Sequence, residues 1–256
     1  MQTEINSVIT LYSNGQIQEA LDSVEVLIKD YPNEALLYNV SGACYAGLGQ
    51  LDTAVKRYEQ ALAIKPDYAE AHNNLGNALK ELDQLDTALK SYEKALGIKP
   101  DFAEAHYNLG ITHQGLNQLD TAIKHYEQAL EIKPDYTEAF NNLGSALKEL
   151  GQLDTAVKHY EQALTIKPDY TEAFNNLGSV LKELGQPDIA VKSYEKILAI
   201  KPDFAEAHYN LGVTLQELGQ LDAAVKHYEQ ALEIKPDYIE AHNNLGIAHK
   251  ELNQLD

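Results

Sequence analysis

Residues 137–170 read TEAFNNLGSALKELGQLDTAVKHYEQALTIKPDY, and near-copies of this segment fill most of the chain. The prolines show its period. Those that recur every 34 residues are Pro32, Pro66, Pro100, Pro134, Pro168, Pro202 and Pro236. Because proline stops a helix, this fixed interval indicates that every unit ends its last helix at the same point. The 256 residues make seven such units and one half unit, which favours a stack of repeats over one globular core.

Each unit is predicted to contain two helices. In residues 137–170, apolar or small residues recur at three- and four-residue steps over 139–150 and again over 156–166. Gly151 follows the first run, where a helix end commonly takes a left-handed residue. Asp154 lies where a cap or a first-turn acid stabilises the start of the second helix, and Pro168 ends that helix.

Small residues are expected where the two helices cross. Gly144 and Ala156 lie on the faces that meet, and large side chains there would hold the two backbones apart. Phe140 and Tyr160 are the bulky partners that fill the remaining space. These side chains therefore form the core of the unit.

The order of these residues resembles the tetratricopeptide repeat. The pattern of aromatic, Leu-Gly, large residue, Ala, aromatic and Pro is carried here by Phe140, Leu143, Gly144, Leu147, Ala156, Tyr160 and Pro168. The usual tryptophan of the family is replaced by Tyr38, His72, His106, Phe140, Phe174, His208 and His242. The resemblance implies an all-α fold, a right-handed α-solenoid (superhelix) of antiparallel helix pairs in 34-residue repeats.

The period also predicts the boundaries of the units. Residues 1–34 form a degenerate N-terminal capping repeat, since Glu4, Ser7 and Val8 stand where other units have an aromatic residue, Leu and Gly. Six full repeats follow, at 35–68, 69–102, 103–136, 137–170, 171–204 and 205–238. Residues 239–256 form the first helix of a truncated eighth repeat. We therefore expect either that the natural chain continues or that the sequence was cut at a repeat boundary, and we expect this end to expose an apolar strip.

Composition excludes several classes of protein. The net charge of −19 comes without basic stripes, which argues against nucleic-acid binding, and 44% hydrophobic residues argue against disorder. Cys44 is the only cysteine, so an internal disulfide is impossible. No apolar run is long enough to cross a membrane, and the first residues do not resemble a secretory signal. We expect a cytoplasmic protein without a membrane partner.

No motif in the chain predicts catalysis. The glycines lie outside the phosphate-binding patterns, and no serine or cysteine stands in a nucleophile motif. The nine histidines form no helical metal-binding pair, and we expect His125, His159 and His227 to point outward. The chain as given is therefore expected to be no enzyme and to bind neither a metal nor another cofactor.

A row of asparagines predicts a binding surface. In the tetratricopeptide family the first helices of the repeats line the concave side, where partners usually bind. The sixth position of the repeats holds Asn74, Asn108, Asn142, Asn176, Asn210 and Asn244, which we call the asparagine row. A side-chain amide can bond both the N–H and the C=O of an extended peptide. The alternative is that asparagine is the family consensus at this position and bonds neighbouring loops or helices. The predicted peptide-binding set also includes Asn77, Tyr107, Asn141, Asn175 and Tyr209.

The predicted partner is a protein or peptide, neutral or basic. The second position of the repeats holds Glu70, Glu104, Glu138, Glu172, Glu206 and Glu240, which would repel an acidic tail. The leading hypothesis is a protein–protein interaction scaffold that binds an extended polypeptide segment in its concave groove. The row also resembles the superhelical arm of the O-linked N-acetylglucosamine transferases, which implies a substrate-recruiting arm of a larger enzyme as an alternative. A second alternative is end-to-end self-association through the C-terminal helix.

Overall fold

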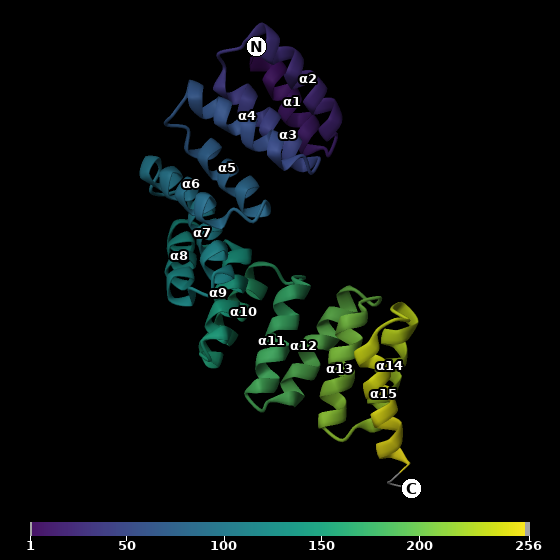
Figure 1. The fold of residues 1–256 in the computed structure, drawn as a ribbon. Coiled ribbons are helices and arrows are strands. Elements are labelled where there is room, and N and C mark those ends of the chain that lie inside the picture. Colours follow the sequence, from purple (N-terminus) through teal and green to yellow (C-terminus); the bar gives the residue numbers. More distant parts are fainter. Residues whose placement is uncertain (1, 254–256) are drawn as a thin grey trace. The chain divides into compact units, whose positions relative to one another are not determined.

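The computed structural model describes residues 2–253, with side chains from residue 3 onward, and α-helix is the only regular structure among them (Figure 1). The chain divides into two compact units, residues 1–134 and 135–256, and each is described by itself. The fold is therefore an all-α helical repeat array, as predicted. The last turn predicted for the truncated eighth repeat, residues 254–256, lies outside the described residues.

From α1 to α14 the helices come in pairs that match the 34-residue period, and α15 follows as a single helix in the described part of the chain. The first unit holds α1 (Gln2–Ser13), α2 (Ile17–Asp30), α3 (Ala35–Gly47), α4 (Leu51–Ile64), α5 (Ala69–Glu81), α6 (Leu85–Ile98), α7 (Ala103–Gly115) and α8 (Leu119–Ile132). The second holds α9 (Thr137–Glu149), α10 (Leu153–Ile166), α11 (Thr171–Glu183), α12 (Pro187–Ile200), α13 (Ala205–Glu217), α14 (Leu221–Ile234) and α15 (Ile239–Leu252). We call the odd-numbered helices the first helices and the even-numbered ones the second helices.

From α1 to α13, each first helix is followed by a residue in the left-handed conformation. Gly151 has φ of 75°, and the Gln152 N–H donates to the carbonyl of Leu147 across the turn. Asp83 and Asn117 take the same conformation without being glycine. Asp154 does not cap α10, because the residue at its start is Gln152; Asp154 lies in the first turn, where an acid favours the helix dipole.

In each of the six full repeats, a glycine of the first helix is pressed against a tyrosine ring of the second. Tyr92, Tyr126, Tyr160, Tyr194 and Tyr228, all on second helices, are 2% exposed or less. A Cβ added to Gly110 of α7 would lie 2.5 Å from the Tyr126 ring, and one added to Gly144 would lie 2.8 Å from the Tyr160 ring. The glycine therefore lets the two helices approach closely enough for the ring to be enclosed. This confirms the crossing that the sequence predicts at Gly144.

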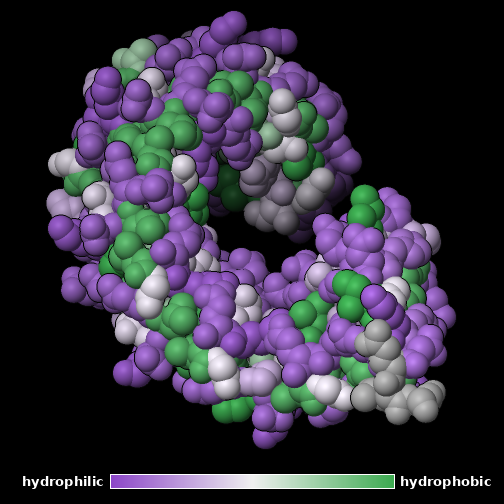
Figure 2. Space-filling model, turned by 60° about the horizontal axis from the view of Figure 1, so that its bottom comes forward, coloured by the Kyte–Doolittle hydropathy of each residue, from purple (hydrophilic) through white to green (hydrophobic). Residues whose placement is uncertain are grey.

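The surface is mainly polar. Hydrophilic side chains cover most of the face shown in Figure 2, with hydrophobic residues in small groups between them. None of the helices over residues 2–253 combines the length and the apolar character that a membrane span requires.

Candidate functional site

The asparagine row bonds the first helix of one repeat to that of the preceding repeat. In the first unit, the side-chain amide of Asn74 donates to Oδ1 of Asn39 at 3.1 Å, and that of Asn108 donates to Oδ1 of Asn73 at 3.0 Å. The second unit repeats the contact, with bonds of 2.9 Å from Asn176 to Asn141 and from Asn210 to Asn175. Each partner stands 35 residues earlier in the chain.

The partner asparagines extend these contacts to acidic residues of the next repeat. Asn141 is 1% exposed, and its amide donates to Glu172 at 2.9 Å while its oxygen accepts from Asn176. Asn175 donates in the same way to Glu206, at 3.2 Å. The two acidic residues are among the glutamates at the second position of the repeats, and they therefore help to fix the repeats to one another.

The other predicted site residues lie on the same helices. Oδ1 of Asn77 accepts from the Tyr92 hydroxyl at 2.8 Å, and the Tyr209 hydroxyl accepts from Asn244 at 3.2 Å. Tyr107 is half-buried with its ring 6.0 Å from that of Tyr126. Of the predicted peptide-binding residues, Asn108 and Asn141 are buried. The others are half-buried and keep partial solvent exposure: Asn74, Asn77, Tyr107, Asn142, Asn175, Asn176, Tyr209, Asn210 and Asn244.

Lysines form a second set of contacts between repeats. Lys148 Nζ lies 2.8 Å from Glu183, and Lys182 Nζ lies 2.9 Å from Glu217, again 35 residues apart. These pairs are partly exposed, so each adds at most about 1 kcal/mol. Together with the amide bonds they hold adjacent first helices side by side.

In the first unit, a pocket lies beside part of the asparagine row. The pocket has a volume of about 470 Å³, lies between α3 and α5 and is lined by Asn74 and Asn77 of the predicted set, by Tyr12 and Tyr58, and by Glu81. Amide groups, hydroxyl groups and a carboxylate thus meet around one depression. Such a lining can exchange hydrogen bonds with a peptide backbone or a polar side chain.

The histidines on the second helices do not point outward, and that prediction was wrong. Nδ1 of His125 lies 3.1 Å from Nδ1 of His106, and Nδ1 of His227 lies 3.0 Å from Nδ1 of His208. The ring of His159 stacks on that of Phe140 at 6.0 Å. The position on the second helix thus packs against the aromatic position of the first helix in the same repeat.

These histidine pairs predict a loss of stability in acid. Burial, followed by repulsion from His106 and His113, lowers the pKa of His125 to about 4. The unfolded chain, with a histidine pKa near 6.5, then takes up the proton first, so stability falls as the pH drops from about 6.5 toward 4.

We expect the melting temperature to fall between pH 7 and pH 5, and the fall to be smaller in His125→Gln. Glutamine keeps an N–H donor for His106 but does not titrate. Differential scanning calorimetry at the two pH values measures both effects. An identical fall in the two proteins would rule out His125 as a cause.

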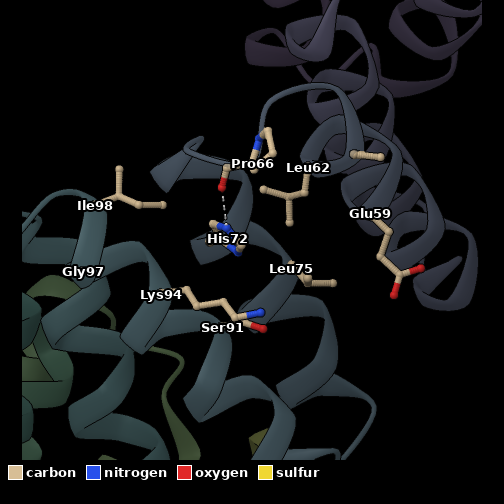
Figure 3. Close-up of a pocket in the computed structure, with 10 residues that line it drawn as sticks. Glu59, Leu62, Pro66, His72, Leu75, Ser91, Lys94, Gly97 and Ile98 are labelled. Atoms are coloured by element: carbon tan, nitrogen blue, oxygen red, sulfur yellow. Dashed lines mark hydrogen bonds between the residues drawn. The ribbon is translucent and has the colours of Figure 1, made fainter.

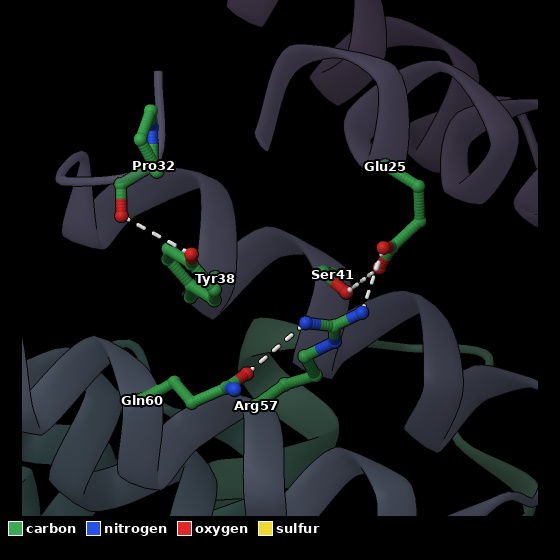
Figure 4. A network of polar contacts seen from close by, with 6 residues as sticks. All are labelled: Glu25, Pro32, Tyr38, Ser41, Arg57 and Gln60. Atoms are coloured by element: carbon green, nitrogen blue, oxygen red, sulfur yellow. Dashed lines mark hydrogen bonds and ion pairs between the residues drawn. The ribbon is translucent and has the colours of Figure 1, made fainter. Parts of the chain in front are cut away.

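In the repeat of α3 and α4, Tyr38 and Arg57 stand at the positions that His106 and His125 occupy in their own repeat. The Arg57 guanidinium lies 5.9 Å from the centre of the Tyr38 ring, donates to Glu25 of α2 at 2.7 Å and donates to Gln60 at 3.0 Å (Figure 4). Ser41 donates to the other oxygen of Glu25 at 2.7 Å. This network joins α2, α3 and α4, so its role is structural.

No residue set in the described part of the chain forms a metal site. Groups of three or more His, Cys, Asp or Glu side chains with suitable placement do not occur within residues 2–253. The two ring nitrogens of His106 instead bond His125 at 3.1 Å and the carbonyl oxygen of Pro100 at 3.3 Å.

The face of α15 carries exposed apolar side chains. Ile239 is 70% exposed and Ile247 is 49% exposed. The structure thus places exposed isoleucines where the sequence predicts an apolar strip. Self-association through this helix stays a prediction.

Comparison with family models identifies the repeats. Models described as TPR repeat match residues 42–83, 76–117 and 216–253, and models described as tetratricopeptide repeat match residues 101–169, 135–203 and 193–226. Together these matches run without a gap from residue 42 to residue 253. No curated protein matches the chain significantly.

Two solved structures are similar to this chain in both fold and sequence. A crystal structure of YrrB, described as a TPR protein with an unusual peptide-binding site, is 26% identical with a TM-score of 0.62 and covers 74% of this chain and 98% of YrrB. A crystal structure of MamA is 28% identical with a TM-score of 0.61 and covers 65% of this chain and 97% of MamA.

A more distant structure supports the fold alone. The APC/C hetero-tetramer Cut9–Hcn1 matches with a TM-score of 0.75 at 18% identity and covers 94% of this chain. The match covers 48% of the Cut9–Hcn1 chain, so this protein spans about half the length of that relative.

Proposed function

Since the chain belongs to the tetratricopeptide repeat family, we propose that it is a protein–protein interaction scaffold that holds an extended polypeptide segment against its first helices. We propose a binding role, not a catalytic one, for these repeats. The peptide-binding site described for YrrB, which shares 26% identity, supports this proposal.

The observation that carries the proposal is the fixed orientation of the asparagine row. Asn176 and Asn210 each donate one amide N–H to the preceding repeat, at 2.9 Å. A side-chain amide has a second N–H and two acceptor lone pairs, so the bond between repeats leaves capacity for a ligand. Because the amides are already ordered, less conformational entropy is lost when a peptide binds.

The negative charge beside the asparagine row favours some partners over others. Glu172 and Glu206 are exposed and accept hydrogen bonds from Asn141 and Asn175, which hold the carboxylates near the row. A neutral or basic segment therefore fits better than an acidic one. With hydrogen bonds of about 1 kcal/mol each, a short segment is expected to bind with at most micromolar affinity.

The test compares two double variants that each break two contacts between repeats. Asn176→Ala with Asn210→Ala removes two members of the row. Lys148→Ala with Lys182→Ala removes the ion pairs to Glu183 and Glu217 and leaves the row intact. We expect the first variant to lose about 25-fold in affinity for peptides selected from a library, about fivefold for each lost hydrogen bond. The second variant is expected to lose much less.

Fluorescence anisotropy with the selected peptides measures the affinity, and circular dichroism confirms that both variants stay helical. Equal losses in the two variants would mean that disturbed packing between repeats is the cause. The row would then have no direct role in binding.

A further inference from the structure

A larger pocket lies on another part of the first unit and shares no residue with the asparagine row. It has a volume of about 740 Å³, between α4 and α6 and beside the start of α5 (Figure 3). Leu62, Leu75 and Ile98 give it apolar walls, and His72, Ser91 and Lys94 give it polar groups. Pockets of this size commonly accept small molecules or single side chains.

His72 holds an unused acceptor in this pocket. The side chain is 9% exposed, and its Nε2 lies 3.0 Å from the carbonyl oxygen of Pro66. Because a carbonyl only accepts, Nε2 carries the proton. Burial lowers the pKa of His72, so the ring is neutral at pH 7 and Nδ1 keeps its lone pair. Within residues 2–253, that buried Nδ1 finds no hydrogen-bond partner.

Two other repeats show what satisfies a histidine in this position. Nε2 of His208 lies 3.0 Å from the carbonyl oxygen of Pro202, so its Nδ1 is again the acceptor. Nδ1 of His227 lies 3.0 Å away and donates its N–H. His125 does the same for His106 at 3.1 Å. In both repeats the donor is an imidazole ring from the second helix.

Serine replaces that ring beside His72. Ser91 stands at the position of His227 in the repeat, and its hydroxyl donates to the Thr87 carbonyl at 3.0 Å within α6. The pocket that contains His227 has a volume of about 380 Å³, against about 740 Å³ here. The missing imidazole therefore leaves both a space and an unsatisfied acceptor.

We propose that this pocket binds a neutral planar heteroaromatic ring whose N–H donates to Nδ1 of His72. The ligand takes the place that the His227 imidazole occupies in its own repeat. Leu62 and Leu75 offer apolar contact to the ring, while Lys94, where the equivalent residue is Gln230, disfavours a cationic ring. The ring can belong to a small molecule or to a histidine side chain of a polypeptide.

The test uses imidazole and 1-methylimidazole as probes at about pH 8, where both are mostly neutral. The full chain carries nitrogen-15 in its histidines, and long-range proton–nitrogen spectra follow Nδ1 of His72. We expect imidazole to shift this resonance in a saturable way and to bind about fivefold more tightly than 1-methylimidazole, which has no N–H. Equal affinity for the two probes, or no saturation, would overturn the proposal.

Two variants exchange the pocket between neighbouring repeats. Ser91→His restores the ring found beside His106 and is expected to abolish binding and to move the His72 Nδ1 resonance toward that of His106. His125→Ser is expected to create a second imidazole site, at His106. Unchanged imidazole binding in a folded Ser91→His protein, or no gain of a site in His125→Ser, would contradict the assignment.

A third probe separates the two sources of the ring. N-acetylhistidine amide presents the same imidazole as part of a polypeptide. Tighter binding than free imidazole would indicate a partner side chain, and weaker binding would indicate a small molecule. Because these variants leave the asparagine row intact, failure here does not bear on peptide binding by the first helices.

Discussion

Replacing Tyr126 by alanine is expected to destabilise the first unit by about 3–5 kcal/mol, the range found when a large aromatic side chain is removed from a core. The Tyr126 side chain is fully buried, and its hydroxyl donates to Gln114 at 2.8 Å. Its ring also fills the contact with Gly110, so the variant leaves a cavity between α7 and α8. Urea unfolding followed by circular dichroism measures the change.

The matched control is Tyr126→Phe, which keeps the ring and removes only the hydroxyl. We expect a loss of about 1 kcal/mol, the usual value for one hydrogen bond. In a repeat array each unit contacts mainly its neighbours, so hydrogen exchange in the alanine variant should rise first in α7 and α8. A uniform rise along the chain, or equal losses in the two variants, would contradict this account of the core.

The helix pairs were predictable because their signals are local. The left-handed Gly151 and the helix-ending Pro168 act on the backbone within a few residues of themselves. Gly144 and Tyr160 belong to the same repeat, so one unit of sequence contains both partners of the contact. For these reasons the periodic sequence predicts helix bounds and core residues well.

The contacts between repeats were harder to predict. The sequence indicates the asparagine row but not its partners, since the pairing of Asn176 with Asn141 depends on how one first helix is rotated against the next. The spacing of 35 residues, one repeat plus one position, is the signal that could have revealed it. The asparagine row bonds neighbouring helices, as the alternative hypothesis predicted. These bonds are compatible with peptide binding, because each amide keeps further hydrogen-bonding capacity.

The position of the second-helix histidines was not predictable from one helix alone. His125 lies at the edge of the apolar stripe of α8, where a side chain can turn either to solvent or to the first helix. For His125, the lone pair on Nδ1 of His106 favours the inward orientation, because a buried acceptor without a donor is costly. His159 turns inward against the ring of Phe140 instead. In one repeat His125 fills the space beside His106 and bonds its Nδ1. In the preceding repeat Ser91 stands at that position, so a pocket remains and Nδ1 of His72 has no partner.

Two glycines at the same position of the repeat are expected to respond to alanine in opposite directions. In Gly110→Ala the new Cβ would lie 2.5 Å from the Tyr126 ring, so the helices must separate, at a cost of about 1–3 kcal/mol. For Gly246 of α15, nothing in the described part of the chain lies within 4 Å of the added Cβ. Gly246→Ala should therefore gain up to about 1 kcal/mol from helix propensity alone.

Urea midpoints and hydrogen exchange in α7 and α15 measure the two effects separately. The pair tests one physical claim, that glycine is needed at this position because a tyrosine ring from the second helix occupies the space of a side chain. If both variants were stabilised, propensity would outweigh the contact and the tyrosine would not determine the residue. If both were destabilised, Gly246 would have a packing partner, and the face of α15 would be covered in solution.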